Sequence, residues 1–241
     1  MLPEFPQFKK LELSDKEDVE KFTSKYPPYS DFNFVSMWSW DIKGEMRIST
    51  LNDNLVVRFN DYLTGEPFYS FLGNNKVNET AEALLGLSIK EELQPKLKLV
   101  PKDSIKGLDL SKFKVTEDRD NFDYIVHIDR LKPHDGKIRK LSSRRKMINK
   151  LKKLSERSVA SIDLNESKIT NEILRVFSDW EMQGGVGEEN TKHLKASIER
   201  TFLLGKQQHT IALGAFANGR LVGYTINEIV GNGYALGHFQ Q

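Results

Sequence analysis

Ten cationic side chains lie between Lys137 and Arg157, where the only acid is Glu156. This segment carries a net charge of about +9, whereas the whole chain carries +2, so the remainder carries about −7. Charge separated in this way is typical of a surface that binds a polyanion through its phosphates. The alternative is a lysine-rich helix that only faces solvent, because charged faces are common on protein surfaces.

The same segment has the periodicity of an amphipathic helix, at about 100° per residue. Cations fall on one side and apolar residues on the other, so the helix can pack by one face and offer the other to an anion. The cationic stripe comprises Arg139, Lys146, Lys150, Lys153 and Arg157, and the apolar side comprises Leu141, Met147, Ile148, Leu151 and Leu154.

Other kinds of site find little support in the sequence. The chain has no cysteine, which excludes disulfides, thiolate zinc sites and cysteine nucleophiles. Its five histidines never occur at a metal-ligand spacing, so no metal site is predicted. The glycines at 184–187 and 231–233 lack the strand and the Lys-Ser/Thr of a phosphate loop, and no G-x-S-x-G elbow is present.

Length and composition indicate a globular protein. The chain has 241 residues, of which 38% are hydrophobic and 29% charged, enough for one large domain or two small ones. No apolar run approaches the ~18 residues of a membrane span, and the first residues show no signal-peptide pattern. The expected location is the cytoplasm.

The first half predicts a strand, two helices, three antiparallel strands, a helix and a strand. Ser14 and Glu17 form a capping box for the first helix, and the aromatic residues of the second are interpreted as core. This is the order of a GNAT acyltransferase fold. The strands are predicted at 8–13, 46–50, 54–59, 68–72 and 96–100, the second and third helices at 32–40 and 77–93, and a further strand at Tyr124–Ile128.

The second half repeats the order of helices followed by a three-strand meander. Its strands are predicted at 159–163, 210–217, 221–230 and 234–239, and its helices at 169–183 and 191–204, with Asn-Gly hairpin turns at 218–219 and 232–233.

The sequence therefore predicts an α+β protein of two tandem GNAT-like units with mixed, mainly antiparallel sheets. The units span residues 1–128 and 129–241, and their boundary is expected near 126–136. The second unit is expected to be incomplete, because the chain ends before the helix that holds the cofactor pyrophosphate in GNAT proteins. Its last strand would be an exposed edge that promotes self-association.

Four segments in order resemble the phosphatidylglycerol lysyltransferase C-terminal domain family, over nearly the whole chain. They are the strand Asn121-Phe-Asp-Tyr-Ile125 after an acidic run, the basic Arg144-Arg-Lys-Met-Ile-Asn149, PYSDFNFVSMWSWD near the N-terminus and YALGHFQ at the C-terminus. Within the basic motif, Lys146 and Met147 replace the usual Asn and His. Near the C-terminus, Gln240 stands where the relatives carry glutamate.

The resemblance implies an enzyme that moves an aminoacyl group from a charged tRNA to a lipid or other acceptor, without a cofactor. His238 and Glu228 would line the transfer site as catalytic residues, and Tyr124, Arg145, Asn149 and Gln240 would bind substrate. The cations expected to contact the tRNA are Arg139, Lys140, Arg144, Lys146, Lys150 and Lys153. Two alternatives stay open: an acyl-CoA-dependent N-acyltransferase with the same fold, and a catalytically silent RNA-binding module.

Overall fold

The computed structural model describes residues 1–61, 64–130, 156–184, 187–204, 210–231 and 233–241. The chain divides into two compact units. Unit 1 comprises Met1–Phe122, Ala196–Leu204 and Val230–Tyr234, and unit 2 comprises Asp123–Lys195, Gly205–Ile229 and Ala235–Gln241. The change from unit 1 to unit 2 falls after residue 122, and two short segments of the second half belong to unit 1.

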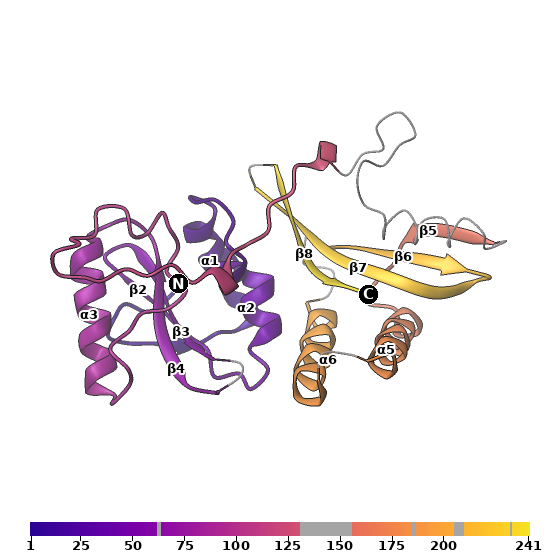
Figure 1. Cartoon of the computed structure of the whole chain (residues 1–241), viewed down its shortest axis with the longest axis horizontal. Coiled ribbons are helices and arrows are strands. Elements are labelled where there is room, and N and C mark those ends of the chain that lie inside the picture. Colours follow the sequence, from indigo (N-terminus) through magenta and orange to yellow (C-terminus); the bar gives the residue numbers. More distant parts are fainter. Residues whose placement is uncertain (62–63, 131–155, 185–186, 205–209, 232) are drawn as a thin grey trace. The chain divides into compact units, whose positions relative to one another are not determined.

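The fold class is α+β, with two antiparallel four-stranded sheets and five α-helices among the described residues (Figure 1). The helices are α1 (Lys16–Thr23), α2 (Phe34–Trp40), α3 (Val77–Lys90), α5 (Ser167–Met182) and α6 (Glu188–Phe202). The first sheet has the order β1-β2-β3-β4: β1 (Lys9–Lys10), β2 (Arg47–Leu51), β3 (Asn54–Asn60) and β4 (Pro67–Leu72). The second has the order β5-β6-β7-β8: β5 (Arg157–Ser161), β6 (Thr210–Ala217), β7 (Arg220–Val230) and β8 (Tyr234–Gln240).

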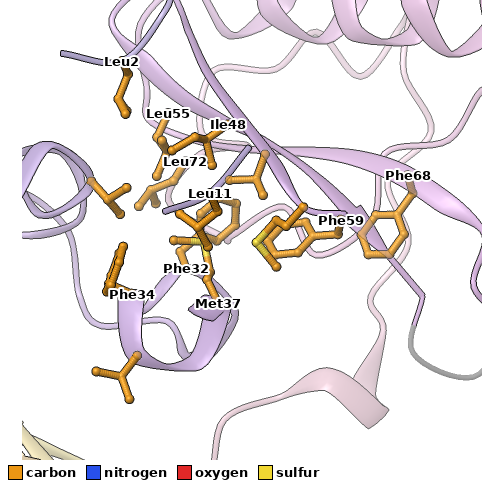
Figure 2. Packing of buried hydrophobic residues seen from close by; sticks show 14 of the residues in the cluster. Leu2, Leu11, Phe32, Phe34, Met37, Ile48, Leu55, Phe59, Phe68 and Leu72 are labelled. Atoms are coloured by element: carbon orange, nitrogen blue, oxygen red, sulfur yellow. The ribbon is translucent and has the colours of Figure 1, made fainter. Parts of the chain in front are cut away.

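The sheet of unit 1 is covered on both faces, which explains why β3 has apolar residues at the consecutive positions 55–57 rather than only at alternate ones. Successive side chains of a strand point to opposite faces. Leu55, Val57 and Phe59 pack with α1 and α2, whereas Val56 packs with α3 (Figures 1 and 2). Figure 2 shows the larger of the two clusters, in which the aromatic residues Phe32 and Phe34 lie in the core as expected.

Helix α2 begins and ends on polar side chains. The side chain of Asn33 caps its N-terminus by accepting a hydrogen bond from the Ser36 amide at 3.0 Å. At its C-terminus, Oδ1 of Asp41 accepts the amides of Glu45 at 2.7 Å and Met46 at 3.0 Å. Asp41 therefore fixes the turn that leads into β2.

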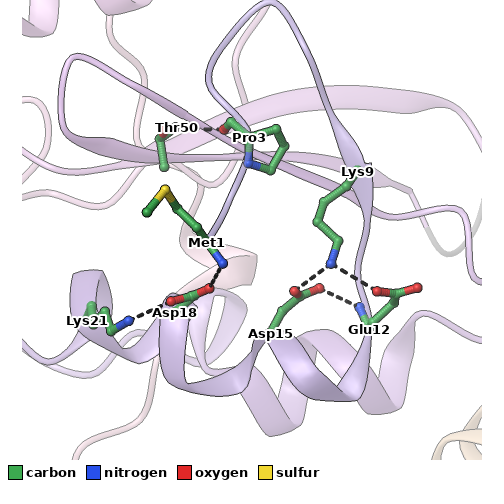
Figure 3. A network of polar contacts seen from close by, with 8 residues as sticks. All are labelled: Met1, Pro3, Lys9, Glu12, Asp15, Asp18, Lys21 and Thr50. Atoms are coloured by element: carbon green, nitrogen blue, oxygen red, sulfur yellow. Dashed lines mark hydrogen bonds and ion pairs between the residues drawn. The ribbon is translucent and has the colours of Figure 1, made fainter.

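Ion pairs join the first residues of unit 1 to the segment around α1 (Figure 3). Lys9 Nζ lies 2.6 Å from Asp15 and 2.9 Å from Glu12, and Asp15 in turn accepts the Glu12 amide at 2.9 Å. This reciprocal contact forms a capping box at a short 3-10 helix, Leu13–Asp15. The expected capping box of Ser14 and Glu17 is therefore wrong, because the turn begins two residues earlier, at Glu12.

The sheet of unit 2 is built around the β6–β7 hairpin. Asn218 and Gly219 form its turn with φ of 50° and 73°, as a two-residue hairpin requires. Helix α5 buries Ile173, Val176 and Phe177. Its Arg175 bonds to the carbonyl of Leu221, which ties the helix to β7.

Two expected strands are absent from the described residues, and one expected helix ends differently. The segment Lys96–Val100 is irregular because Leu99 adopts φ of 57°, and a single backbone bond joins Lys98 to Tyr69. Tyr124–Ile128 pairs with no strand of the sheets and leads into a 3-10 helix, Ile128–Arg130. Arg157 opens β5, paired with Ala217, rather than closing the basic helix. The remainder of the basic segment, 137–155, lies outside the described residues.

Candidate functional site

The structure brings Glu228 of β7 and His238 of β8 together. Nε2 of the imidazole lies 3.3 Å from Oε2 of the carboxylate. The two side chains are only 4% and 3% exposed, so the contact is almost shielded from water. The two residues named as catalytic candidates therefore form a carboxylate–imidazole pair inside unit 2.

Antiparallel pairing places these two residues. Glu228 lies opposite Thr210 at one end of the β6–β7 register. On the other side of β7, Tyr224 and Gln241 exchange two backbone hydrogen bonds of 3.0 and 3.1 Å. A Cβ on Gly223 would lie 3.0 Å from the Gln241 carbonyl oxygen, so a glycine permits this close approach.

A buried carboxylate beside a histidine has a defined chemical effect. An ionised carboxylate only accepts hydrogen bonds, so a charged Glu228 selects the ring form with a proton on Nε2 of His238. The carboxylate also orients the ring and stabilises the imidazolium that forms when the ring takes up a proton. The pair can therefore serve a proton transfer, with His238 as the base and Glu228 as its positioning residue.

Tyr224 is a further residue of this sheet face, and the sequence reasoning did not single it out. It lies four positions before Glu228 on β7 and therefore on the same face. Its hydroxyl is buried and has no hydrogen-bond partner among the described residues, and burial raises its pKa. The alternation along 221–230 could have identified it.

Of the remaining expected site residues, the structure describes only Tyr124 and Gln240. The side chain of Tyr124 is fully exposed, in the extended segment that was expected to be a strand. Gln240 is an exposed residue at the end of β8. The other expected residues lie outside the described residues: Arg139, Lys140, Arg144, Arg145, Lys146, Asn149, Lys150 and Lys153.

The chain resembles a solved structure in its fold. It matches the crystal structure of a conserved protein of unknown function from Bacteroides thetaiotaomicron VPI-5482 with a TM-score of 0.74. The match covers 100% of this chain and 80% of that chain, at 19% sequence identity. No protein-family model and no curated protein sequence matches the chain. At this identity the likeness concerns the fold alone.

The part of the chain that the structure describes contains neither a membrane-spanning helix nor a cluster of metal-binding side chains. None of its helices combines the length and the apolar character needed to cross a membrane. Within the same residues, no three histidine, aspartate or glutamate side chains gather in a way that could hold a metal ion.

Proposed function

We propose that this protein is an aminoacyltransferase that moves an aminoacyl group from a charged tRNA to an amine or hydroxyl acceptor, such as a lipid. The observation that carries the proposal is the buried pair of Glu228 and His238, which join across β7 and β8 at 3.3 Å. In the resemblance to the lysyltransferase family, His238 of YALGHFQ and Glu228 of the neighbouring strand line the transfer site.

The order of elements supports a tandem GNAT-like scaffold for this reaction. The two sheets have the same strand order, and each half of the chain runs through one strand, two helices and a three-strand meander. That order is the one found at the start of a GNAT fold. The same argument supports an acyl-CoA-dependent N-acyltransferase as the second candidate function.

The proposed reaction asks little of the protein, because an aminoacyl ester is already activated. The acceptor nitrogen or oxygen forms a bond to the ester carbonyl carbon, and the bond from that carbon to the ribose oxygen breaks. The acceptor proton passes to His238 and then to the departing ribose oxygen, so the ring acts first as base and then as acid. Glu228 holds the ring and stabilises its charged form.

A transfer assay on the full chain tests the proposal. The chain is incubated with tRNA charged with radiolabelled amino acids and with phosphatidylglycerol vesicles, and the label is followed in the tRNA and lipid fractions. A parallel reaction offers labelled acetyl-CoA and a mixture of amines. We expect transfer from tRNA, reduced by about 10²-fold or more in His238→Gln, in line with the usual contribution of a general base.

A matched control separates this effect from a general loss of structure. Glu181→Gln introduces the same replacement residue at an exposed position of α5 and should leave transfer unaltered. Transfer from acetyl-CoA but not from tRNA would favour the second candidate. If tRNA binds and neither donor is consumed, both enzymatic readings are wrong and the silent RNA-binding module is left.

A further inference from the structure

Unit 1 contains a pocket of about 270 Å³ at the C-terminal end of α2. All of its lining residues belong to that unit, Arg200 through the segment Ala196–Leu204. At about 30 Å³ per water molecule, the volume corresponds to about nine waters, which is the size of a small metabolite. Leu11, Leu13 and Trp38 give the pocket an apolar wall.

Two buried polar atoms of the lining residues lack a hydrogen-bond partner among the described residues. They are Nε1 of Trp38, a donor, and Oδ2 of Asp41, an acceptor. Asp41 is only 7% exposed, and its other oxygen already holds the turn into β2. Buried polar groups without a partner are rare in folded proteins, and each calls for an explanation.

Two cations face this carboxylate. The guanidinium of Arg200 lies 4.2 Å from the centre of the Trp38 ring, and its Nε donates to the Trp38 carbonyl at 2.8 Å. Lys10 lies over Gly44, where a Cβ would come within 2.7 Å of its Nζ. Burial raises the pKa of Asp41, and the charges of Arg200 and Lys10 act in the opposite direction. Glu12, which also lines the pocket, is paired with Lys9 at 2.9 Å.

We propose that this pocket binds a free α-amino acid with a small apolar side chain. The α-carboxylate lies against Lys10 and Arg200 and accepts from Nε1 of Trp38, and the α-ammonium donates to Oδ2 of Asp41. A ligand with only a carboxylate would meet the buried charge of Asp41, and one with only an ammonium would meet two cations. A zwitterion complements both signs at once.

Binding requires one wall side chain to move, because Oδ2 of Asp41 and Nε1 of Trp38 are both covered in the structure. Lys10 can make this change, since its residue is exposed and its side chain is flexible. Rotamer changes of this kind are common when ligands bind. The proposal does not depend on the aminoacyl transfer proposed above, since Glu228 and His238 belong to unit 2.

Calorimetric titration of the full chain tests the proposal, with L-alanine, L-valine and L-leucine as probes. N-acetyl-L-leucine lacks the ammonium and L-leucinamide lacks the carboxylate, and each should bind at least about tenfold more weakly than L-leucine, because a hydrogen bond to a charged group is lost. Equal binding of L-leucine and N-acetyl-L-leucine would overturn the proposal. So would the absence of heat with all three amino acids, which would leave water as the occupant of the pocket.

Substitutions locate the binding. Asp41→Asn keeps an oxygen for the two backbone amides and should weaken the binding of L-leucine by about tenfold or more. Lys10→Gln changes an exposed residue and should weaken the binding of L-leucine, so that L-leucinamide, which lacks the carboxylate, comes closer to it in affinity. The matched control is Asp109→Asn, a partly buried residue of unit 1 whose carboxylate bonds to Ser111 of its own loop. If L-leucine binds the Asp41→Asn and Lys10→Gln chains as tightly as the unaltered chain, the ligand lies elsewhere and the proposal is wrong.

Discussion

Glu228 and His238 depend on each other because both are removed from water. Each supplies a polar contact in place of the water that burial removes, so replacing one of them takes a hydrogen-bond partner from the other. The contact therefore has a consequence for stability that does not depend on catalysis.

We expect Glu228→Ala to lower the free energy of unfolding by about 1–3 kcal/mol, the usual cost of removing one partner of a buried hydrogen bond. Urea unfolding followed by circular dichroism measures the change. Glu181→Ala, at an exposed position of α5, should alter stability by no more than about 0.5 kcal/mol. Equal unfolding midpoints for the two variants would show that the contact does not hold unit 2 together.

Replacing Asp41 should raise stability, in contrast to replacing Glu228, because the buried charge of Asp41 disfavours the folded state. Burial raises its pKa above the ordinary 3.8, so the folded state holds the proton more tightly than the unfolded chain. The stability that Asp41 contributes is present below pH 3.8 and is lost as the pH rises through its raised folded pKa.

Asp41→Asn should therefore stabilise the protein at neutral pH, within the about 0.5–2 kcal/mol usual for a stabilising replacement. The gain should shrink toward zero below pH 3.8, where the carboxyl of the unaltered chain is protonated as well. Melting temperatures of both proteins between acid and neutral pH measure the difference. A gain that stays constant with pH would mean that the charge of Asp41 is not the cause.

Single residues were predicted from the sequence where a local pattern identified them. The family resemblance pointed to Glu228 and His238, which the structure places 3.3 Å apart. Trp38 was interpreted as core, and it does pack against the main cluster of unit 1. Its contact with Arg200 joins residues far apart in the sequence, so no local pattern could have indicated that Asp41 lines a pocket.

Among the elements, the β6–β7 hairpin agrees best with the prediction from the sequence. Its turn needs two residues with positive φ, and Asn-Gly supplies them. By contrast, Lys96–Val100 and Tyr124–Ile128 have residues that favour strands but find no partner strand in the described residues. Strand propensity reflects packing against neighbours, so a favourable sequence without a partner strand stays irregular.

Gly219→Ala should destabilise the hairpin by about 1–2 kcal/mol, because an L-residue resists the left-handed conformation. Space is not the reason, since no atom lies within 4 Å of a Cβ at Gly219. Gly86→Ala is the matched change: it lies within helix α3 with equally open space and should stabilise by about 0.5–1 kcal/mol. Urea midpoints that move in the same direction for both variants would contradict the conformational argument.

The basic segment gives a prediction that depends only on charge. If four of its cations contact phosphates, log Kd for tRNA should change with log salt by about 3–4, from ~0.7–0.9 per contact. Lys146→Gln with Lys150→Gln should reduce that slope by about two contacts and leave the melting temperature nearly unchanged, because exposed cations contribute little to stability. Filter binding at three salt concentrations measures the slope. An unaltered slope would mean that these cations only face solvent.

At the scale of the whole molecule, the two sheets repeat one strand order, β1-β2-β3-β4 and β5-β6-β7-β8. The sequence predicted the α+β class, because the patterns that indicate strands and helices are local. It did not predict that Ala196–Leu204 belongs to unit 1, because membership of a distant core depends on contacts that local patterns do not contain.

Leu204 allows a test of the assignment of Ala196–Leu204 to unit 1, because it is buried in the core that also contains Ile48 and Leu55. Leu204→Ala should destabilise unit 1 by about 2–5 kcal/mol, the range for a leucine removed from a core. The neighbouring Leu203 is 63% exposed, and Leu203→Ala should cost little. Hydrogen exchange of the β3 amides measures the effect on unit 1, and equal exchange in both variants would contradict it.

The segment Ala196–Leu204 also has a consequence for the time course of biosynthesis. The first 122 residues of unit 1 leave the ribosome before the residues that complete its core have been made. At about 5–20 residues per second, the interval between residues 122 and 204 is roughly 4–16 s. During that interval the nascent unit 1 lacks Leu204, and its apolar surface is open to chaperones or to neighbouring chains on the same polysome.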